Sequence, residues 1–126
     1  MGMEQKVSFT GKSPPTWTAV SELLTRRGFP VQTRMVDGQL AFPDEVPPDD
    51  WKELRLGTPL GMVTLRRVGD AVTFVTWGNA DAALRQTWNA LTWAFAEAGG
   101  GMVQSEQGAC DAETFRRRAE MPATLQ

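Results

Sequence analysis

The N-terminal part of the chain changes from a strand pattern to a helix pattern. Apolar and polar side chains alternate over residues 6–10, as they do in a strand with one buried face. Ser13 can cap a helix, and Trp17 and Leu24 then recur on one helical face. Gly28 is of the residue type that most often follows the end of a helix. We therefore predict a strand over residues 6–10 and an amphipathic helix of about four turns that ends at Gly28.

The dipeptide Asp37-Gly38 separates two segments that contain alternating apolar residues, 31–36 and 39–43. Both residue types accept the positive φ angles that a two-residue hairpin turn requires. The sequence therefore predicts a hairpin in which Val36 lies opposite Gln39. This register divides the side chains between two faces, a core face with Val31, Thr33, Met35, Leu40 and Phe42 and an opposite face with Gln32, Arg34, Gln39 and Ala41.

Gly69-Asp70 lies in the same way between residues 62–68 and 71–77, and it predicts a second hairpin. The core face of this hairpin would carry Val63, Leu65, Val72 and Phe74. Its other face would carry Met62, Thr64, Arg66, Thr73, Val75 and Trp77. This second set is too apolar for an ordinary solvated surface.

The segment that joins the two hairpins has a different composition. Residues 43–50 contain three prolines and four carboxylates, which favour a solvated loop. We expect a short edge strand over Trp51–Leu56 and a turn from Gly57 to Gly61.

A second helix follows the second hairpin. Asn79 can cap it, and the three glycines at 99–101 end it. The buried stripe consists of side chains at helical spacing, namely Leu84, Trp88, Leu91 and Phe95. Trp93 lies five residues after Trp88, which rotates it by about 140° away from that stripe. We therefore expect Trp93 to face outward, together with Asn89 and Gln86.

The order strand, helix, four main strands, helix predicts an α+β fold. We expect an antiparallel sheet of four to six strands with two long helices on one face. Residues 1–104 would form this single α+β domain, because the length suits one hydrophobic core. Residues 105–126 would form a short C-terminal tail, with a possible short helix over residues 111–120.

Composition narrows the chemistry that the chain can perform. Hydrophobic residues make up 41% and charged residues 22%, which is typical of a folded protein rather than a disordered one. The chain has no histidine and no tyrosine, so the usual bases of nucleophilic triads and the usual ligands of catalytic zinc are absent. Proton transfer would depend on carboxylates, three lysines or the single cysteine, Cys110. The sequence therefore favours a non-enzymatic role.

Charge and the N-terminal sequence bear on location and partners. The net charge of −2 gives no positive field that would attract nucleic acid or an anionic membrane. No segment is long and apolar enough to span a membrane, and Glu4 and Lys6 have no apolar stretch behind them that would indicate a secretory signal. We expect a cytoplasmic protein.

Other motifs do not indicate a catalytic, metal or cofactor site. The acidic residues Asp44, Glu45, Asp49 and Asp50 lack the spacing of a calcium loop. The three glycines at 99–101 follow a helix, whereas a phosphate-binding loop precedes one. Cys110 has no histidine to activate it, and Arg116–Arg118 are consecutive, so they fan out around a helix. We therefore predict no catalytic residues, no metal ligands and no cofactor.

Two surfaces carry residue types that concentrate in protein interfaces. One is the predicted outer flank of the second helix, with Trp93. The other is the sheet face opposite the helices, with Met62, Val75, Trp77, Arg34 and Arg66. Monomeric proteins seldom expose a large contiguous apolar patch, so either the tail or the acidic loop covers these surfaces or another subunit does.

We expect a protein–protein interaction domain, a homodimer in its commonest form. One alternative is a small-ligand-binding domain or enzyme, which a sheet–helix cavity holding Glu or Asp beside a buried lysine would favour. A second alternative is single-stranded nucleic-acid binding, in which Trp77 stacks on bases while Arg34 and Arg66 contact phosphates. The net negative charge argues against nucleic acid.

Overall fold

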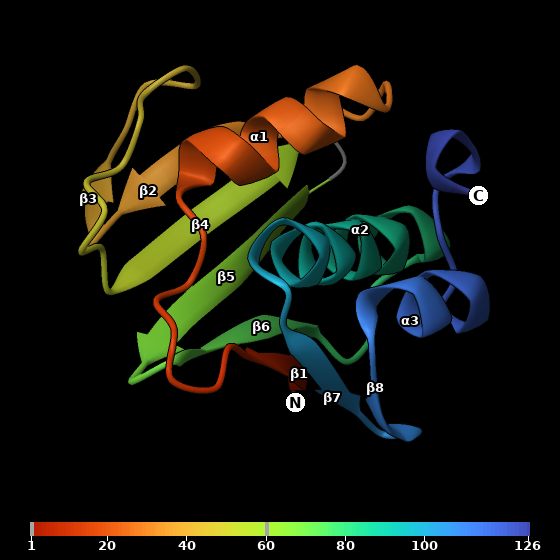
Figure 1. Cartoon of the computed structure of the whole chain (residues 1–126). Helices are drawn as coiled ribbons and strands as arrows, with labels where there is room; N and C mark the ends of the chain where they lie inside the picture. Colours follow the sequence, from red (N-terminus) through yellow and green to blue (C-terminus); the bar gives the residue numbers. More distant parts are fainter. Residues whose placement is uncertain (1, 60) are drawn as a thin grey trace.

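The computed structural model describes residues 2–59 and 61–126, in which three α-helices lie against one eight-stranded antiparallel sheet (Figure 1). The helices are α1 (Trp17–Arg26), α2 (Ala82–Gly99) and α3 (Ala112–Arg118), and the 3-10 helix η1 (Ala123–Leu125) lies at the C-terminus. The strands are β1 (Gly2–Ser8), β2 (Gln32–Val36), β3 (Gln39–Leu40), β4 (Glu53–Thr58), β5 (Gly61–Val68), β6 (Ala71–Trp77), β7 (Met102–Ser105) and β8 (Gly108–Cys110).

The strands lie in the order β3-β2-β4-β5-β6-β1-β7-β8. The fold is α+β, but the predicted four to six strands and two long helices are wrong. The three-residue strand β8 is too short to show an alternating pattern in the sequence. The predicted edge strand over Trp51–Leu56 is also wrong, because β4 pairs with β2 on one side and with β5 on the other.

The β5–β6 hairpin has the predicted register, with Val68 opposite Ala71 and Leu65 opposite Phe74. In the β2–β3 hairpin the predicted pair Val36–Gln39 also forms, but the pairing ends at Leu40. A register shift between Thr33 and Met35 interrupts β2. The prediction that Met35, Leu40 and Phe42 belong to the core is therefore wrong, and the side chains of Leu40 and Phe42 are 89% and 76% exposed.

Helices α1 and α2 lie on the same face of the sheet, so one face is covered and the other is not (Figure 1). The four apolar residues predicted for the core face of the second hairpin are fully buried, namely Val63, Leu65, Val72 and Phe74. The ring of Phe95 on α2 meets the ring of Phe74 edge-on, with 5.3 Å between centroids. The core therefore lies between the sheet and the helices.

The first helix begins later than the sequence predicts. Its cap is Thr16, whose hydroxyl accepts a hydrogen bond from the backbone N–H of Ala19, and not Ser13. Proline disfavours the helical conformation in the residue before it, so Pro14 and Pro15 keep Ser13 and Pro14 out of the helix and delay its first turn. Gly28 follows the helix with a φ of 76°, as predicted.

The second helix also begins later than predicted. Its cap is Asp81, whose carboxylate accepts a hydrogen bond from the N–H of Leu84, and not Asn79. A carboxylate at this position also complements the positive end of the helix. The helix ends at Gly99, and Gly100 adopts the left-handed conformation with a φ of 66°.

Residues 105–126, which the sequence pattern leaves as a tail, form β8, α3 and η1 against α2. Four of their apolar side chains belong to the main core cluster, namely Ala112, Phe115, Met121 and Leu125. At the N-terminus, β1 begins at Gly2 and ends at Ser8 instead of covering residues 6–10. The turn predicted from Gly57 to Gly61 includes Leu60, which lies outside the described residues.

Candidate interaction surface

The face of the sheet that the helices do not cover is built by strand alternation. Thr64 lies opposite Val75, and Arg66 lies opposite Thr73. Because side chains alternate between the two faces of a strand, these residues point away from the buried set that includes Leu65. We call this side of the sheet the uncovered face.

Three apolar residues gather at one end of the uncovered face, and we call them the Trp77 patch: Met62, Val75 and Trp77. The side chain of Trp77 is 68% exposed and that of Met62 is 46% exposed, while Val75 is half-buried. Tryptophan is usually highly buried in folded proteins, so this exposure is unusual. The patch is therefore a surface that burial against another molecule would stabilise.

Two glycines border the Trp77 patch and leave it accessible from the neighbouring strands. Gly2 lies opposite Trp77, and a Cβ atom at Gly2 would lie 3.4 Å from Cγ1 of Val75. Gly57 lies opposite Met62, and a Cβ atom at Gly57 would lie 3.3 Å from Cγ of Met62. At these two positions the neighbouring strands carry no side chain that could cover the patch, which leaves it open to contact with another surface.

The middle of the uncovered face is polar. Nε of Arg66 donates a hydrogen bond of 3.4 Å to Oε2 of Glu53, so Arg66 is engaged within the chain. Nε of Arg55 lies 4.0 Å from Oε1 of the same glutamate, which is too long for a hydrogen bond. Exposed ion pairs of this kind contribute little to stability.

Arg34 lies at the register shift in β2 and is half-buried. Its Nη2 donates a hydrogen bond of 3.3 Å to the backbone carbonyl of Thr58, while Met35 takes the place opposite Arg55. The nucleic-acid alternative requires Arg34 and Arg66 to contact phosphates. Each of them already donates a hydrogen bond to an acceptor within the protein.

Trp93 does not lie on the surface, so the prediction that it faces outward is wrong. Its side chain is 2% exposed, and the guanidinium of Arg27 lies 5.4 Å from the centre of its ring. Asn89, expected to face outward beside it, is 8% exposed. Of the two tryptophans in the predicted contact set, Trp77 alone is therefore exposed.

The second helix is covered on more than one flank. Arg27, which lies over Trp93 of α2, is at the C-terminal end of α1. A Cβ atom on the adjacent Gly28 would lie 3.4 Å from Cγ2 of Thr124, so the C-terminal segment packs against the same end of α1. On another flank, Nδ2 of Asn89 donates a hydrogen bond of 2.9 Å to the backbone carbonyl of Glu120. Segments after residue 105 thus cover helix surface that a two-helix fold would leave open.

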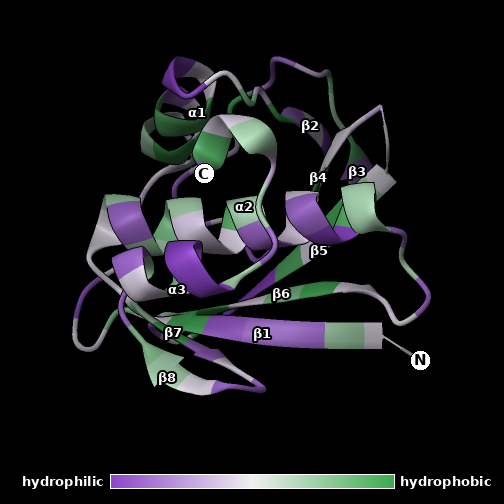
Figure 2. Cartoon of the chain, turned by 90° about the vertical axis from the view of Figure 1, so that its right-hand side faces the viewer, coloured by the Kyte–Doolittle hydropathy of each residue, from purple (hydrophilic) through white to green (hydrophobic). Residues whose placement is uncertain are grey.

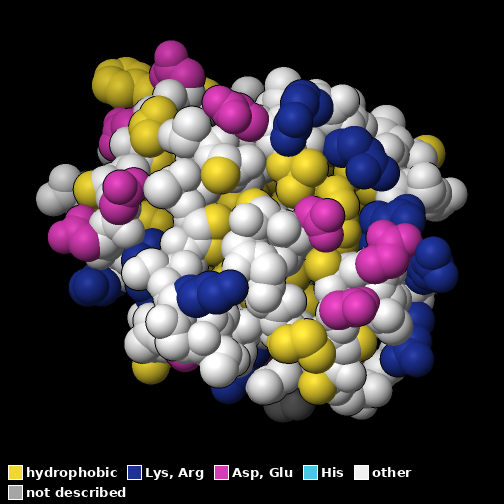
Figure 3. All heavy atoms as spheres, in the orientation of Figure 1, with side chains coloured by type: hydrophobic (Ala, Val, Ile, Leu, Met, Phe, Trp, Pro, Cys, Tyr) yellow, Lys and Arg dark blue, Asp and Glu magenta, His cyan; other side chains and the backbone are white. Residues whose placement is uncertain are grey.

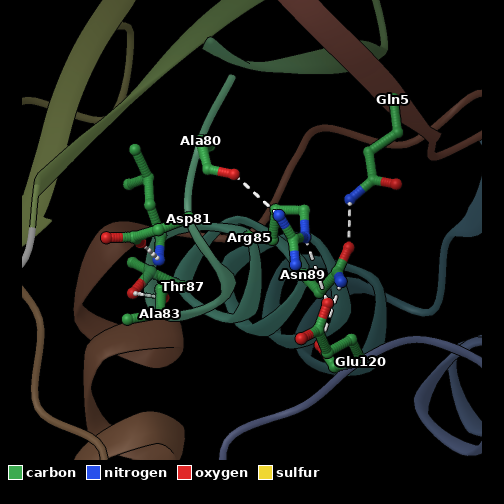
Figure 4. A network of polar contacts seen from close by, with 9 residues as sticks. Gln5, Ala80, Asp81, Ala83, Arg85, Thr87, Asn89 and Glu120 are labelled. Carbon is green, nitrogen blue, oxygen red and sulfur yellow. Dashed lines mark hydrogen bonds and ion pairs between the residues drawn. The ribbon is translucent and has the colours of Figure 1, made fainter. Parts of the chain in front are cut away.

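A cleft of about 220 Å³ lies between the N-terminal half of β1, the β7–β8 turn, α2 and the end of α3, and we call it the β1 cleft. Its lining includes Gln5, Trp88, Asn89, Cys110, Phe115 and Arg118. Gln5 is 5% exposed, and its Nε2 donates a hydrogen bond of 2.9 Å to Oδ1 of Asn89 (Figure 4). The same Nε2 donates a second hydrogen bond of 2.9 Å to Oγ1 of Thr92. Nε of Arg85 donates at 3.2 Å to Glu120 at the edge of the cleft.

Sequence reasoning missed the polar base of this cleft. Gln5 is two residues before Val7, so both side chains lie on the same face of β1, and Val7 is fully buried. A glutamine at such a core position indicates a buried hydrogen-bond network. The signal was hidden because the predicted strand began at residue 6. Cys110, predicted to be inert, is half-buried in the lining of the cleft.

The acidic loop is exposed, and apolar side chains accompany it. Figure 3, which views the molecule from the helix side, shows hydrophobic and acidic side chains together at the end where Figure 1 places β3 and the following loop.

The carboxylates of Asp49 and Asp50 in this loop interact electrostatically with Arg67, whose guanidinium lies 4.3 Å from the ring centre of Trp51. Burial lowers the pKa of Arg67, and these two carboxylates partly oppose that effect. Within residues 2–59 and 61–126, no three or more Cys, Asp or Glu side chains are grouped so that they could hold a metal ion.

Asp37 joins the first hairpin turn to the centre of the sheet. Its Oδ1 accepts hydrogen bonds from the backbone N–H groups of Glu53 at 2.9 Å and Lys52 at 2.7 Å. These two donors hold the pKa of Asp37 below its ordinary value. Asp37 thereby fixes the start of β4, which carries Arg55 and Gly57 on the uncovered face.

No protein-family model matches this chain, and neither a curated protein nor a solved structure matches it significantly. Among the helices of the described residues, none has both the length and the apolar composition needed to cross a bilayer. The functional argument therefore rests on the surfaces of the molecule itself.

Proposed function

We propose that this protein is a non-enzymatic interaction domain that pairs with a second copy of itself through the uncovered face. The observation that carries the proposal is the 68% exposure of Trp77 beside Met62. A buried tryptophan removes roughly 150–250 Å² of largely apolar surface from water, and such residues dominate binding energy at interfaces.

Charge on the uncovered face favours a second copy as the partner. Glu4 and Lys6 lie on the same face of β1, while Arg66 on β5 and Glu53 on β4 lie on the other side of β6. Because a two-fold axis brings the same surface against itself, a face with both signs can pair acidic with basic side chains. A stable interface buries about 800 Å² on each partner, so contact would extend from the Trp77 patch over the central strands.

The alternative of an enzyme or small-ligand-binding domain has weaker support from the structure than the interaction domain. Its distinguishing feature was a cavity with an acidic side chain beside a buried lysine. Among the described residues that line the β1 cleft none is a lysine, and Lys6, Lys12 and Lys52 are all exposed. The β1 cleft suits binding more than proton transfer, and we return to it below.

Light scattering of the purified chain tests the proposal. We expect the parent to have twice the mass of one chain, and the Trp77→Ala variant to dissociate at least about thirtyfold more readily, as expected for loss of a central tryptophan. Leu40→Ala is the matched control, because Leu40 is 89% exposed but lies on β3 at the edge of the sheet. A parent that is monomeric at about 100 μM, well above a micromolar dissociation constant, would rule out the proposal.

A further inference from the structure

The N-terminal half of β1 has a strand partner on one side only. β1 pairs with β6 over its whole length, from Gly2–Trp77 to Ser8–Ala71. On the other side, β7 pairs only with Lys6, Val7 and Ser8. Figure 2 shows β1 running past the β7–β8 hairpin toward the N-terminus, with no strand beyond it on that side.

Hydrogen-bond alternation shows which backbone groups this arrangement leaves free. The N–H of Phe9 donates to the carbonyl of Asp70 at 2.9 Å, one step beyond the Ser8–Ala71 pair. In an antiparallel ladder, residues bonded to the same neighbour recur every second position. Val7, Gln5 and Met3 therefore turn their backbone groups toward β6, and Glu4 and Gly2 turn theirs toward the open edge.

The β7–β8 turn explains why Glu4 lacks a partner. The next hydrogen-bonded pair in the β1–β7 register, two residues beyond Lys6–Gln104, would join Glu4 to Glu106, but Ser105 already pairs with Gly108 as the chain reverses. Two carboxylates opposite one another would also repel. Within the described residues, the N–H and C=O of Glu4 thus lie at a sheet edge that no strand completes.

The β1 cleft lies beside this edge, on the helix side of the sheet. An added strand would place the residue opposite Glu4 on the uncovered face, and the residues before and after it in the cleft. There, Trp88 and Phe115 offer apolar walls, and the buried side chain of Gln5 presents an Oε1 to which no described residue donates a hydrogen bond. Figure 4 shows this oxygen pointing away from Asn89.

Charge around the edge specifies the side chain that would lie opposite Glu4. The carboxylates of Glu4 and Glu106 make no ion pair with a described residue, whereas Arg85 is paired with Glu120 at 3.2 Å. Arg118 is the one unpaired cation among the described residues of the lining, so the unpaired charge there is negative overall. A lysine or arginine opposite Glu4 would complement it.

The geometry points to a peptide-binding edge: residues Gly2–Gln5 accept an extended, basic peptide segment that adds to β1 in line with β7. Backbone hydrogen bonds to Glu4 and Gly2 hold the segment, and the cleft receives one of its side chains. This mode of recognition uses the free edge of a sheet for affinity and adjoining pockets for specificity. The inference does not depend on the proposed dimer, which uses the face of the sheet and not its edge.

The test titrates the full chain carrying Trp77→Ala, so that self-association does not interfere, with the acetylated and amidated tetrapeptide Val-Lys-Val-Lys. We expect saturable changes in the NMR amide signals of residues 3–5 and 105–108. The same peptide with methyl groups on the backbone nitrogens of its lysines lacks the N–H donors that would face β1 and should not bind. Val-Glu-Val-Glu should bind at least about fivefold more weakly, because its carboxylates meet Glu4.

Two variants separate backbone from charge. Glu4→Pro removes the outward N–H, a loss that edge strands tolerate, together with the carboxylate, and should weaken binding about fivefold to tenfold. Glu4→Gln keeps the N–H and should weaken binding less, while Glu22→Gln on α1 is a control with no effect. Equal binding of the N-methylated peptide, equal binding of both tetrapeptides, or no binding at millimolar peptide would each overturn the inference. If Glu4→Pro does not fold, the N-methylated peptide still decides the outcome.

Discussion

Trp77 and Trp93 lie in regions that look alike in sequence and differ completely in the fold. Both regions combine tryptophan with polar neighbours, and both were expected to face outward. Trp93 is 2% exposed on α2, whereas Trp77 is 68% exposed at the end of β6. The difference is set by what lies across from each residue, because α1 and the C-terminal segment close around α2 while no helix crosses the other side of the sheet.

The largest expected effect comes from removing each tryptophan in turn. Trp93→Ala leaves a cavity in the core and should lower the free energy of unfolding by about 3–5 kcal/mol. Trp77→Ala should change it by about 0.5 kcal/mol or less when measured in dilute, monomeric solution, because the side chain is already in water. Urea denaturation followed by circular dichroism gives both values, and similar losses for the two variants would contradict the contrast between the regions.

The C-terminal segment is the next part of the comparison to test. Leu125 lies one residue from the end of the chain and is fully buried, so Leu125→Ala should cost about 3 kcal/mol of stability. Thr124→Ala, at an exposed neighbouring position, is the matched control and should be within about 0.5 kcal/mol of the parent. A neutral Leu125→Ala variant would show that the segment does not cover the helices in solution.

A smaller effect is expected from the buried polar network on the covered side. Gln5→Ala removes the donor that Oδ1 of Asn89 and Oγ1 of Thr92 share, so these buried acceptors lose a partner. We expect a loss of about 2 kcal/mol. Hydrogen exchange should locate the change at β1 and the middle of α2. An unchanged unfolding midpoint would mean that water replaces the amide and that the network is not a structural requirement.

The smallest expected effect concerns Asp37, whose carboxylate accepts hydrogen bonds from the backbone at the start of β4. Because the pKa of Asp37 is lower in the folded state, its stabilisation is present above the unfolded pKa and is lost as pH falls through the folded value. Asp37→Asn should therefore destabilise the protein by less than about 1 kcal/mol at neutral pH and should reduce the loss of stability on acidification. Thermal unfolding from pH 6 to pH 2 measures both, and identical pH profiles would refute this role for Asp37.

Turn chemistry and period-two alternation were sufficient to predict the β5–β6 hairpin and the residues that share a face with Val75. The same reasoning placed the turn and the Val36–Gln39 pair of the β2–β3 hairpin but not its burial. Local sequence determines which residues pair, but burial depends on whether another element lies across from them. Leu40 and Phe42 have no such element, since β3 is at the edge of the sheet.

Short elements account for most of what the sequence did not reveal. β8 and η1 contain three residues each, too few for a period to stand out, and the short helix expected within residues 111–120 is present as α3, but its contact with α2 could not be predicted. The β1 cleft was hidden for the same reason, because it exists only where β7 turns back and α3 returns to α2. The hydrophobic pattern of a single helix does not show which of its faces other segments of the chain will bury.

The most direct test of self-association through the uncovered face is ¹⁹F NMR of the chain labelled with 5-fluorotryptophan, whose five tryptophans give separate probes. We predict that the Trp77 signal, assigned by its loss in Trp77→Phe, moves as the protein concentration rises, while the Trp93 signal stays constant. A Trp77 signal that is unchanged over the concentration range would contradict the account.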